Sequence, residues 1–156
     1  MAVARFDISA PIEEVFRVLA NGWMYPHWVP GPRNVHLVDR RFPQPGTRFL
    51  HTLGRGPIRS TDFTEVIESE PPRRLVLRAR GWPSGLSRVY IQLVPARGGT
   101  RVSIRETPEH GLALALRLPG LRRLLDMRLY EMLRRLGTLA EHFDMSLSVR
   151  PARTRA

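Results

Sequence analysis

Apolar residues recur at helical spacing near both ends of the chain and at every second position in between. Residues 12–19 place their apolar side chains at i, i+3, i+4 and i+7, which predicts a short amphipathic helix. Pro11 suits the first turn of this helix, and Glu13 and Glu14 favour its positive N-terminal end. Residues 119–146 repeat the spacing without a proline after Pro119, and a continuous helix there would measure about 40 Å.

The region between the two helical stretches alternates apolar and polar residues, which is typical of half-buried strands. Val102 and Ile104, for example, alternate with polar neighbours, and the preceding Arg97-Gly98-Gly99-Thr100 is a good hairpin turn. Because most of the alternating segments are joined by short turns, we expect an antiparallel sheet of about seven strands. The strands are expected within residues 3–9, 35–41, 47–53, 61–68, 75–79, 88–93 and 101–105.

A curved sheet with one apolar face and a long helix with one apolar stripe must pack together to bury both. The predicted fold class is therefore α+β: a seven-stranded curved antiparallel sheet wrapped around a long C-terminal helix, with a short helical segment after the first strand. We expect residues 1–147 to form a single domain and residues 148–156 to be a basic, disordered tail.

Four segments occur in an order that resembles a known superfamily. The matching segments are APIEEVF at residues 10–16, YPHWVPG at residues 25–31, EPPRRL at residues 70–75 and GTRV at residues 99–102. In this order they resemble the helix-grip fold of the START and polyketide cyclase/dehydrase superfamily, also called SRPBCC, over residues 2–146. The resemblance implies a deep cavity between the concave face of the sheet and the long helix. Such a cavity would bind a hydrophobic or amphipathic small molecule, such as a polyketide, lipid or isoprenoid.

The superfamily includes both carriers and enzymes, so the resemblance leaves the activity open. The first alternative to a binding protein is a polyketide aromatase/cyclase or dehydrase that uses acid and base groups in the cavity. The second alternative is an interaction module that docks acidic partners through an arginine-rich face of the sheet.

Strand parity identifies two polar candidates for the cavity. His51 shares parity with Phe49 and Leu53, and Glu106 continues the inward parity of Ile104. A polar group on an apolar face must be hydrogen-bonded or solvated, which a ligand cavity permits. An imidazole and a carboxylate in a cavity are also candidates for a catalytic acid and base. The alternative for His51 is a core position in which the backbone supplies its hydrogen bonds. The alternative for Glu106 is that the strand ends there and the side chain reaches solvent.

The other candidate ligand contacts are large apolar side chains. Trp28, in the aromatic turn with Tyr25, either lines the mouth of the cavity or seals the core. Trp82 lies in a strand-connecting loop, where an exposed tryptophan often contacts ligands. The full set of expected ligand-binding residues is Trp28, Phe49, His51, Phe63, Trp82, Glu106, Leu129 and Met132.

The formal charge of +11 comes from an excess of arginine, and all 25 basic residues are arginine. The surplus lies in the strand region and in the tail. Such a charge attracts anionic partners in a salt-dependent way, so an acidic carrier protein is a candidate partner. No recognised nucleic-acid motif is present, and nucleic acid is not an expected partner. The arginines predicted on the outer face of the sheet are Arg78, Arg80, Arg88, Arg101 and Arg105.

Several chemistries have no support in the sequence. The chain has no cysteine, and its five histidines show no metal-ligand spacing, so neither a metal site nor another cofactor is expected. There is no GxSxG motif and no phosphate-binding loop. No segment approaches the roughly 20 apolar residues of a membrane span, so we expect no membrane insertion and a cytoplasmic location. The sequence does not indicate an oligomeric state.

Overall fold

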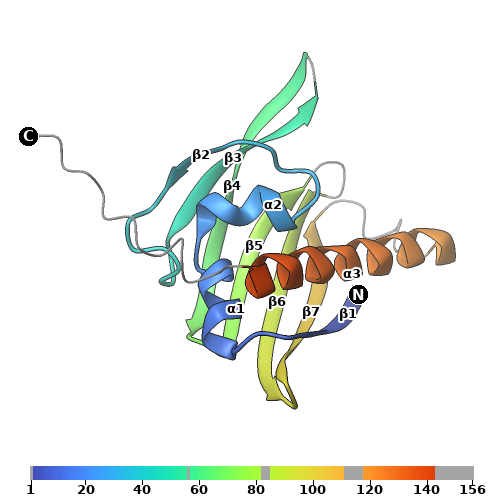
Figure 1. The fold of residues 1–156 in the computed structure, drawn as a ribbon. Helices are drawn as coiled ribbons and strands as arrows, with labels where there is room; N and C mark the ends of the chain where they lie inside the picture. Colours follow the sequence, from blue (N-terminus) through green and yellow to red (C-terminus); the bar gives the residue numbers. More distant parts are fainter. Residues whose placement is uncertain (1, 56, 82–84, 111–117, 143–156) are drawn as a thin grey trace, which may run out of the picture.

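The computed structural model describes residues 2–55, 57–81, 85–110 and 118–142, and it confirms the predicted α+β helix-grip arrangement (Figure 1). Residues 148–156, the expected tail, lie outside the described residues. The strands are β1 (Ala2–Ile8), β2 (Val35–Val38), β3 (Arg48–Arg55), β4 (Ile58–Glu70), β5 (Arg74–Gly81), β6 (Gly85–Ala96) and β7 (Gly99–His110). The helical elements are α1 (Ile12–Leu19), η1 (Gly22–Met24), α2 (Tyr25–Trp28) and α3 (Pro119–His142).

The described strands form one antiparallel sheet in the order β1-β7-β6-β5-β4-β3-β2. Strand β1 therefore crosses to the far side of the sheet and pairs with β7, while β2 to β7 form a simple meander. Helix α3 lies across the concave face, and the segment from α1 to α2 covers one end of it (Figure 1). This arrangement places the short helices and α3 on the same side of the sheet.

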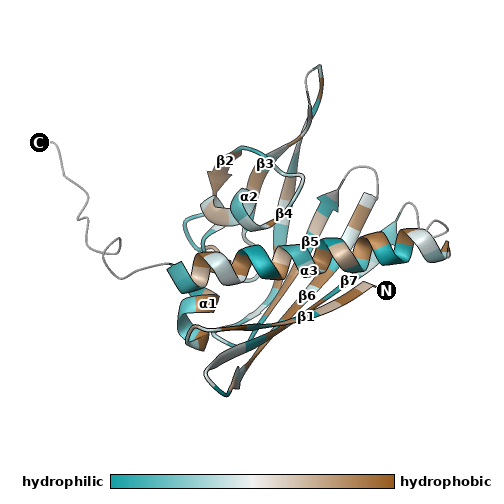
Figure 2. Ribbon diagram, turned by 45° about the vertical axis from the view of Figure 1, so that its right-hand side comes forward, coloured by the Kyte–Doolittle hydropathy of each residue, from teal (hydrophilic) through white to brown (hydrophobic). Residues whose placement is uncertain are grey.

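The core lies between the inward row of the sheet and the C-terminal half of α3. Ile91 pairs with both Leu75 and Ile104, and all three side chains are buried. Helix α3 contributes Leu133 and Leu136, whose side chains are buried. Hydrophobic and hydrophilic segments alternate along this helix, as expected for an amphipathic helix (Figure 2). Burying each of these side chains stabilises the fold by roughly 1.5–3 kcal/mol.

The two halves of α3 are buried to different degrees. No residue from 119 to 128 is buried, whereas the half that begins at Leu129 contains every buried residue of the helix. Asp126 and Glu141 fasten the helix to the first strand region, because their carboxylates accept hydrogen bonds from the backbone N–H groups of Val3 (3.1 Å) and Ser9 (2.9 Å). The N-terminal half of α3 is thus held in place without filling the space between helix and sheet.

The five arginines predicted for the outer face all have partners within the chain. Arg78 and Arg88 both pair with Glu109, at 3.0 and 2.6 Å, and the guanidinium of Arg105 lies 4.3 Å from the ring centre of Tyr90. Arg101 pairs with Asp7 at 2.8 Å, and Arg80 pairs with Asp62 at 3.7 Å. Pairs of this exposed kind contribute little to stability. They account for these arginines without a partner protein, and docking of an acidic partner stays a prediction.

Within the described residues, no helix has both the length and the apolar character needed to cross a bilayer.

Candidate functional site

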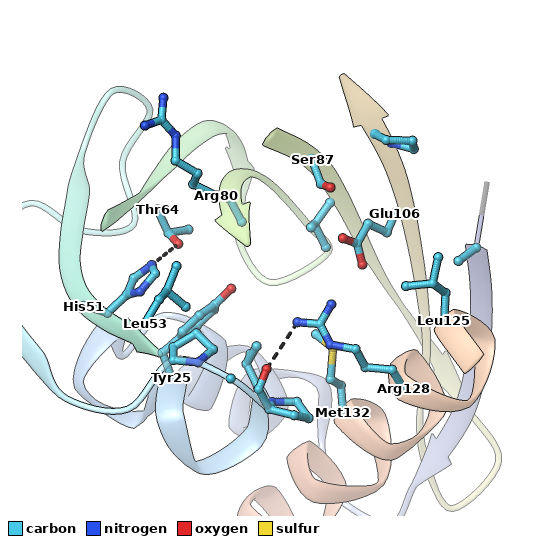
Figure 3. A pocket seen from close by; sticks show the side chains of 18 of the residues that line it. Tyr25, His51, Leu53, Thr64, Arg80, Ser87, Glu106, Leu125, Arg128 and Met132 are labelled. Atoms are coloured by element: carbon cyan, nitrogen blue, oxygen red, sulfur yellow. Dashed lines mark hydrogen bonds between the residues drawn. The ribbon is translucent and has the colours of Figure 1, made fainter. Parts of the chain in front are cut away.

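A cavity of about 420 Å³ lies between the concave face of the sheet, the N-terminal half of α3 and the loop after α2. Its walls are mostly apolar, and a few polar side chains reach into it from different elements (Figure 3). The sheet contributes Leu53 and Val89, and the helix contributes Leu121, Leu125 and Met132. Residues 29–32, Val-Pro-Gly-Pro, form the adjoining wall.

The cavity exists because one row of the sheet carries small side chains. Thr64 pairs with Ala79, and Ala79 pairs with Ser87, so three adjacent strands present small residues side by side. Two positions along β5 and β6 from Ala79 and Ser87, the next inward-facing pair is Leu77 and Val89, which have larger side chains. Larger side chains in the first row would fill the space, as they do in the core. The cavity is therefore a consequence of strand register as much as of composition.

Tyr25, Thr64 and His51 form a polar group in the cavity wall. The Nε2 atom of His51 is hydrogen-bonded to the Thr64 hydroxyl at 3.2 Å, and Tyr25 lies against His51 with ring centres 6.1 Å apart. Burial raises the pKa of Tyr25 to about 12, although the Arg128 charge and a hydrogen bond with Thr64 act in the opposite direction. Tyr25 therefore stays protonated at neutral pH and is able to donate a hydrogen bond.

Burial lowers the pKa of His51 below its ordinary value, against the opposing influence of Asp62. His36 adds a small effect in the same direction as burial. The imidazole is thus neutral near pH 7. Its Nδ1 atom is buried and has no hydrogen-bond partner among the described residues. A neutral imidazole with one free ring nitrogen can accept or donate a proton, depending on its tautomer.

Protonation of His51 is expected to destabilise the fold in acid. Because its pKa is lower in the folded than in the unfolded state, the unfolded chain binds the proton more readily as pH falls below about 6.5. The free energy of unfolding should then fall by up to about 1.4 kcal/mol per pH unit until the folded-state pKa is reached. Urea unfolding between pH 7.5 and 5 measures this slope, and His51→Gln should reduce it. The control His142→Gln, at an exposed helix end, should leave the pH slope unchanged. An unaltered slope in His51→Gln would show that His51 is not the cause of the acid destabilisation.

Arg128 and Glu106 bring opposite charges into the cavity. Arg128, on α3, donates from Nη2 to the carbonyl oxygen of Pro30 at 3.2 Å. Glu106, on β7, makes no hydrogen bond or ion pair with any residue that the structure describes. Figure 3 shows both side chains pointing into the cavity from different elements. A ligand in the cavity would therefore meet a hydrogen-bond donor from the helix and an unpaired carboxylate from the sheet.

The structure places the predicted site residues in three kinds of position. His51, Glu106 and Met132 line the cavity, and the inward orientation that parity gave to His51 is observed. Trp28, Phe49 and Leu129 are buried in the core next to it. Phe63 does not line the cavity, because it pairs with Leu50 on the opposite face, where the guanidinium of Arg48 lies 4.9 Å from its ring centre. Trp82 lies outside the described residues.

Arg128 and the pair Thr64 and Ser87 were not identified from the sequence. Arg128 falls between Leu125 and Met132 on the apolar face of the predicted helix, and an arginine there is a signal for a polar group inside a cavity. Thr64 and Ser87 could be found only through the register of three strands. Tyr25, which precedes Trp28 in the aromatic turn, lines the cavity wall.

The fold and the cavity define a helix-grip protein with a mostly apolar cavity between sheet and helix. The chain belongs to the family described as polyketide cyclase/dehydrase and lipid transport, which it matches over residues 2–141. Among curated proteins, none matches the sequence significantly.

Solved structures share this fold at low sequence identity. The di-domain ARO/CYC StfQ from the steffimycin biosynthetic pathway superimposes with a TM-score of 0.67 at 17% identity, covering 90% of this chain and 50% of StfQ. A protein from Thermus thermophilus gives a TM-score of 0.67 at 18% identity, covering 92% of this chain and 98% of its own. A protein from Nitrosomonas europaea gives 0.64 at 19% identity, covering 91% and 94%. At these identities the likeness concerns the fold.

Proposed function

We propose that this protein binds a hydrophobic or amphipathic small molecule, of the polyketide, lipid or isoprenoid type, in the cavity between the sheet and α3. The observation that carries the proposal is the cavity itself, with its volume of about 420 Å³ and its mostly apolar walls. Ligand sites in proteins commonly have volumes of about 300–1,000 Å³ and a few well-placed polar groups. The membership of the family, whose description includes lipid transport, supports the same assignment.

The polar groups in the cavity favour a ligand with one oxygenated end. Tyr25 and Arg128 offer hydrogen-bond donors, and Glu106 offers an acceptor. The apolar body of the ligand would then lie against Leu121, Leu125 and neighbouring side chains. Binding would remove this apolar surface from water, which is the main source of affinity in such sites.

A variant that fills the cavity tests this proposal directly. Leu125→Trp adds an indole ring inside the cavity and should weaken binding of the neutral fluorescent probe N-phenyl-1-naphthylamine by about tenfold. Leu124→Trp is the matched control, because Leu124 is the adjacent residue and its side chain is exposed. Fluorescence titration gives both affinities. Equal binding by wild type and Leu125→Trp would exclude the cavity as the binding site.

We propose a cyclase or dehydrase activity as a second candidate, because an unpaired carboxylate and several hydrogen-bond donors line the same cavity. In an aldol-type cyclisation, the Glu106 carboxylate would take a proton from a carbon flanked by two carbonyl groups. The electron pair left on that carbon would form a bond to another carbonyl carbon of the same chain, and the π electrons of that C=O bond would move to its oxygen. That oxygen would then gain the proton that Glu106 had taken, directly or through water, which restores the carboxylate. Tyr25 and Arg128 are suited to hydrogen-bond that oxygen as its negative charge develops. The likeness to StfQ, an ARO/CYC protein, supports this candidate at the level of the fold.

A further inference from the structure

A second, more polar pocket of about 340 Å³ lies directly beside the cavity. The two spaces share the loop residues 29–32 and the side of β3 at Leu53. On the side away from the cavity, this pocket is completed by Pro26, Arg33, Gly54 and Arg135. We call it the arginine pocket. A molecule that occupies the cavity therefore lies next to a polar site, and the two spaces are bordered by the same loop.

The arginine pocket has two positive side chains and no acidic residue in its lining. The Arg33 side chain makes no hydrogen bond or ion pair with the described residues, while its backbone N–H donates to the carbonyl oxygen of Thr52 at 2.9 Å. That backbone bond holds the loop against β3. Arg135 pairs with Glu131 through Nε at 3.1 Å, and this bond leaves its two Nη groups available.

Arg128 adds a third positive charge on the other side of the shared wall, where it binds the carbonyl oxygen of Pro30. Guanidinium groups bind phosphate and carboxylate through paired N–H···O hydrogen bonds, and they do so best where several converge from different elements. Arg33 comes from the loop before β2, and Arg135 comes from α3. The positive charge is thus concentrated beside an apolar cavity and comes from two separate elements.

We infer that the arginine pocket binds the phosphate group of a ligand whose apolar body occupies the cavity. This inference rests on the proposed binding function and narrows its ligand class to phosphate esters of an apolar alcohol. A phosphate in the pocket would accept hydrogen bonds from Arg33 and from the Nη groups of Arg135, whose Nε is already bound to Glu131. The loop of residues 29–32 borders both this pocket and the apolar cavity. Monoesters and diesters both present the oxygens that Arg33 and Arg135 require.

A series of ligands with one apolar chain tests the inference. Decanol, decanoate, decyl phosphate and decyl methyl phosphate are each used to displace N-phenyl-1-naphthylamine from the full chain. Decyl phosphate should compete at least tenfold better than decanol, and added salt should reduce this advantage. The decyl methyl phosphate arm shows whether a diester is held as well as a monoester.

Single substitutions locate the site of the phosphate. Arg33→Gln and Arg135→Gln should each reduce the advantage of decyl phosphate over decanol by about fivefold, without changing the binding of decanol. Arg97→Gln, in the exposed β6–β7 turn, is the matched control and should keep the full advantage. Binding of decyl phosphate should also be weakened by Leu125→Trp, because the decyl chain lies in the cavity.

The outcomes separate this inference from the proposed function. If decanol binds and Leu125→Trp weakens it, but phosphate adds no affinity, the binding function stands and the inference is wrong. If the advantage of phosphate persists in both Arg33→Gln and Arg135→Gln, or if decanoate binds as tightly as decyl phosphate, the phosphate assignment is likewise overturned. If none of the four compounds competes, both proposals fail together with the cavity assignment.

Discussion

Gly99→Ala is expected to lower the free energy of unfolding by on the order of 3 kcal/mol, because a side chain at this position meets backbone atoms. A Cβ atom built on Gly99 would lie 1.9 Å from the carbonyl oxygen of Ile8 and 2.9 Å from its carbonyl carbon. Neither atom can move without disturbing the pairing of Ile8 with Thr100, at the point where β1 leads toward α1. Thermal unfolding of the variant should occur roughly 6–12 °C below that of the wild type.

Gly98→Ala is the control for this prediction, since it differs by one position in the same turn. Gly98 has a φ of +79°, and a Cβ atom there would meet nothing within 4 Å. Its substitution should cost only the backbone strain of a left-handed alanine, about 1–2 kcal/mol. If Gly99→Ala were as stable as Gly98→Ala, the close approach of β1 to the β6–β7 turn would not hold in solution.

The fold could be predicted because its periodicities are unambiguous. Alternation at Val89, Ile91 and Leu93 requires a strand with one buried face, and the structure buries all three side chains. The long helical stripe of residues 119–146 required an apolar surface to cover, and the concave face of the sheet is that surface. The short helix was predicted at the right place, with Pro11 in its first turn, and the structure shows it over Ile12–Leu19 with Pro11 as the N-cap residue. These elements depend on local patterns, which a single sequence contains.

Apart from Met132 on the apolar stripe of the helix, the cavity-lining residues that were predicted from the sequence depend on parity within one strand. Parity predicted His51 and Glu106 correctly. Phe63 was expected to contact the ligand, but it follows the opposite parity to Thr64 on β4 and therefore lies on the other face of the sheet. The small row formed by Thr64, Ala79 and Ser87 depends on the register between strands, which turn lengths and bulges set. Arg128 was missed because only the apolar residues of the helix stripe were considered as core or as ligand contacts. The cavity thus depends on the pairing register of neighbouring strands, which could not be predicted from the single sequence.

Glu106→Gln is expected to slow base-catalysed proton removal in the cavity by about 100-fold, which is the usual scale for loss of a positioned general base. A suitable probe is 5-nitrobenzisoxazole, a small aromatic compound that fits the volume of the cavity. Removal of its ring C–H proton by the carboxylate breaks the N–O bond and yields a nitrile and a coloured phenolate, with no other reactant. The Tyr25 hydroxyl and the Arg128 guanidinium are available to hydrogen-bond the phenolate oxygen.

The absorbance of the phenolate measures the rate, and Glu13→Gln is the matched control because Glu13 is an exposed carboxylate on α1. The amide of glutamine preserves the size of the side chain but cannot accept the proton at neutral pH, so probe binding should change far less than the rate. A wild-type rate no greater than that of acetate at equal concentration would exclude acid and base chemistry in this cavity. Loss of rate in His51→Gln alone would instead identify the imidazole as the base, because its Nδ1 atom is buried and also lacks a partner among the described residues.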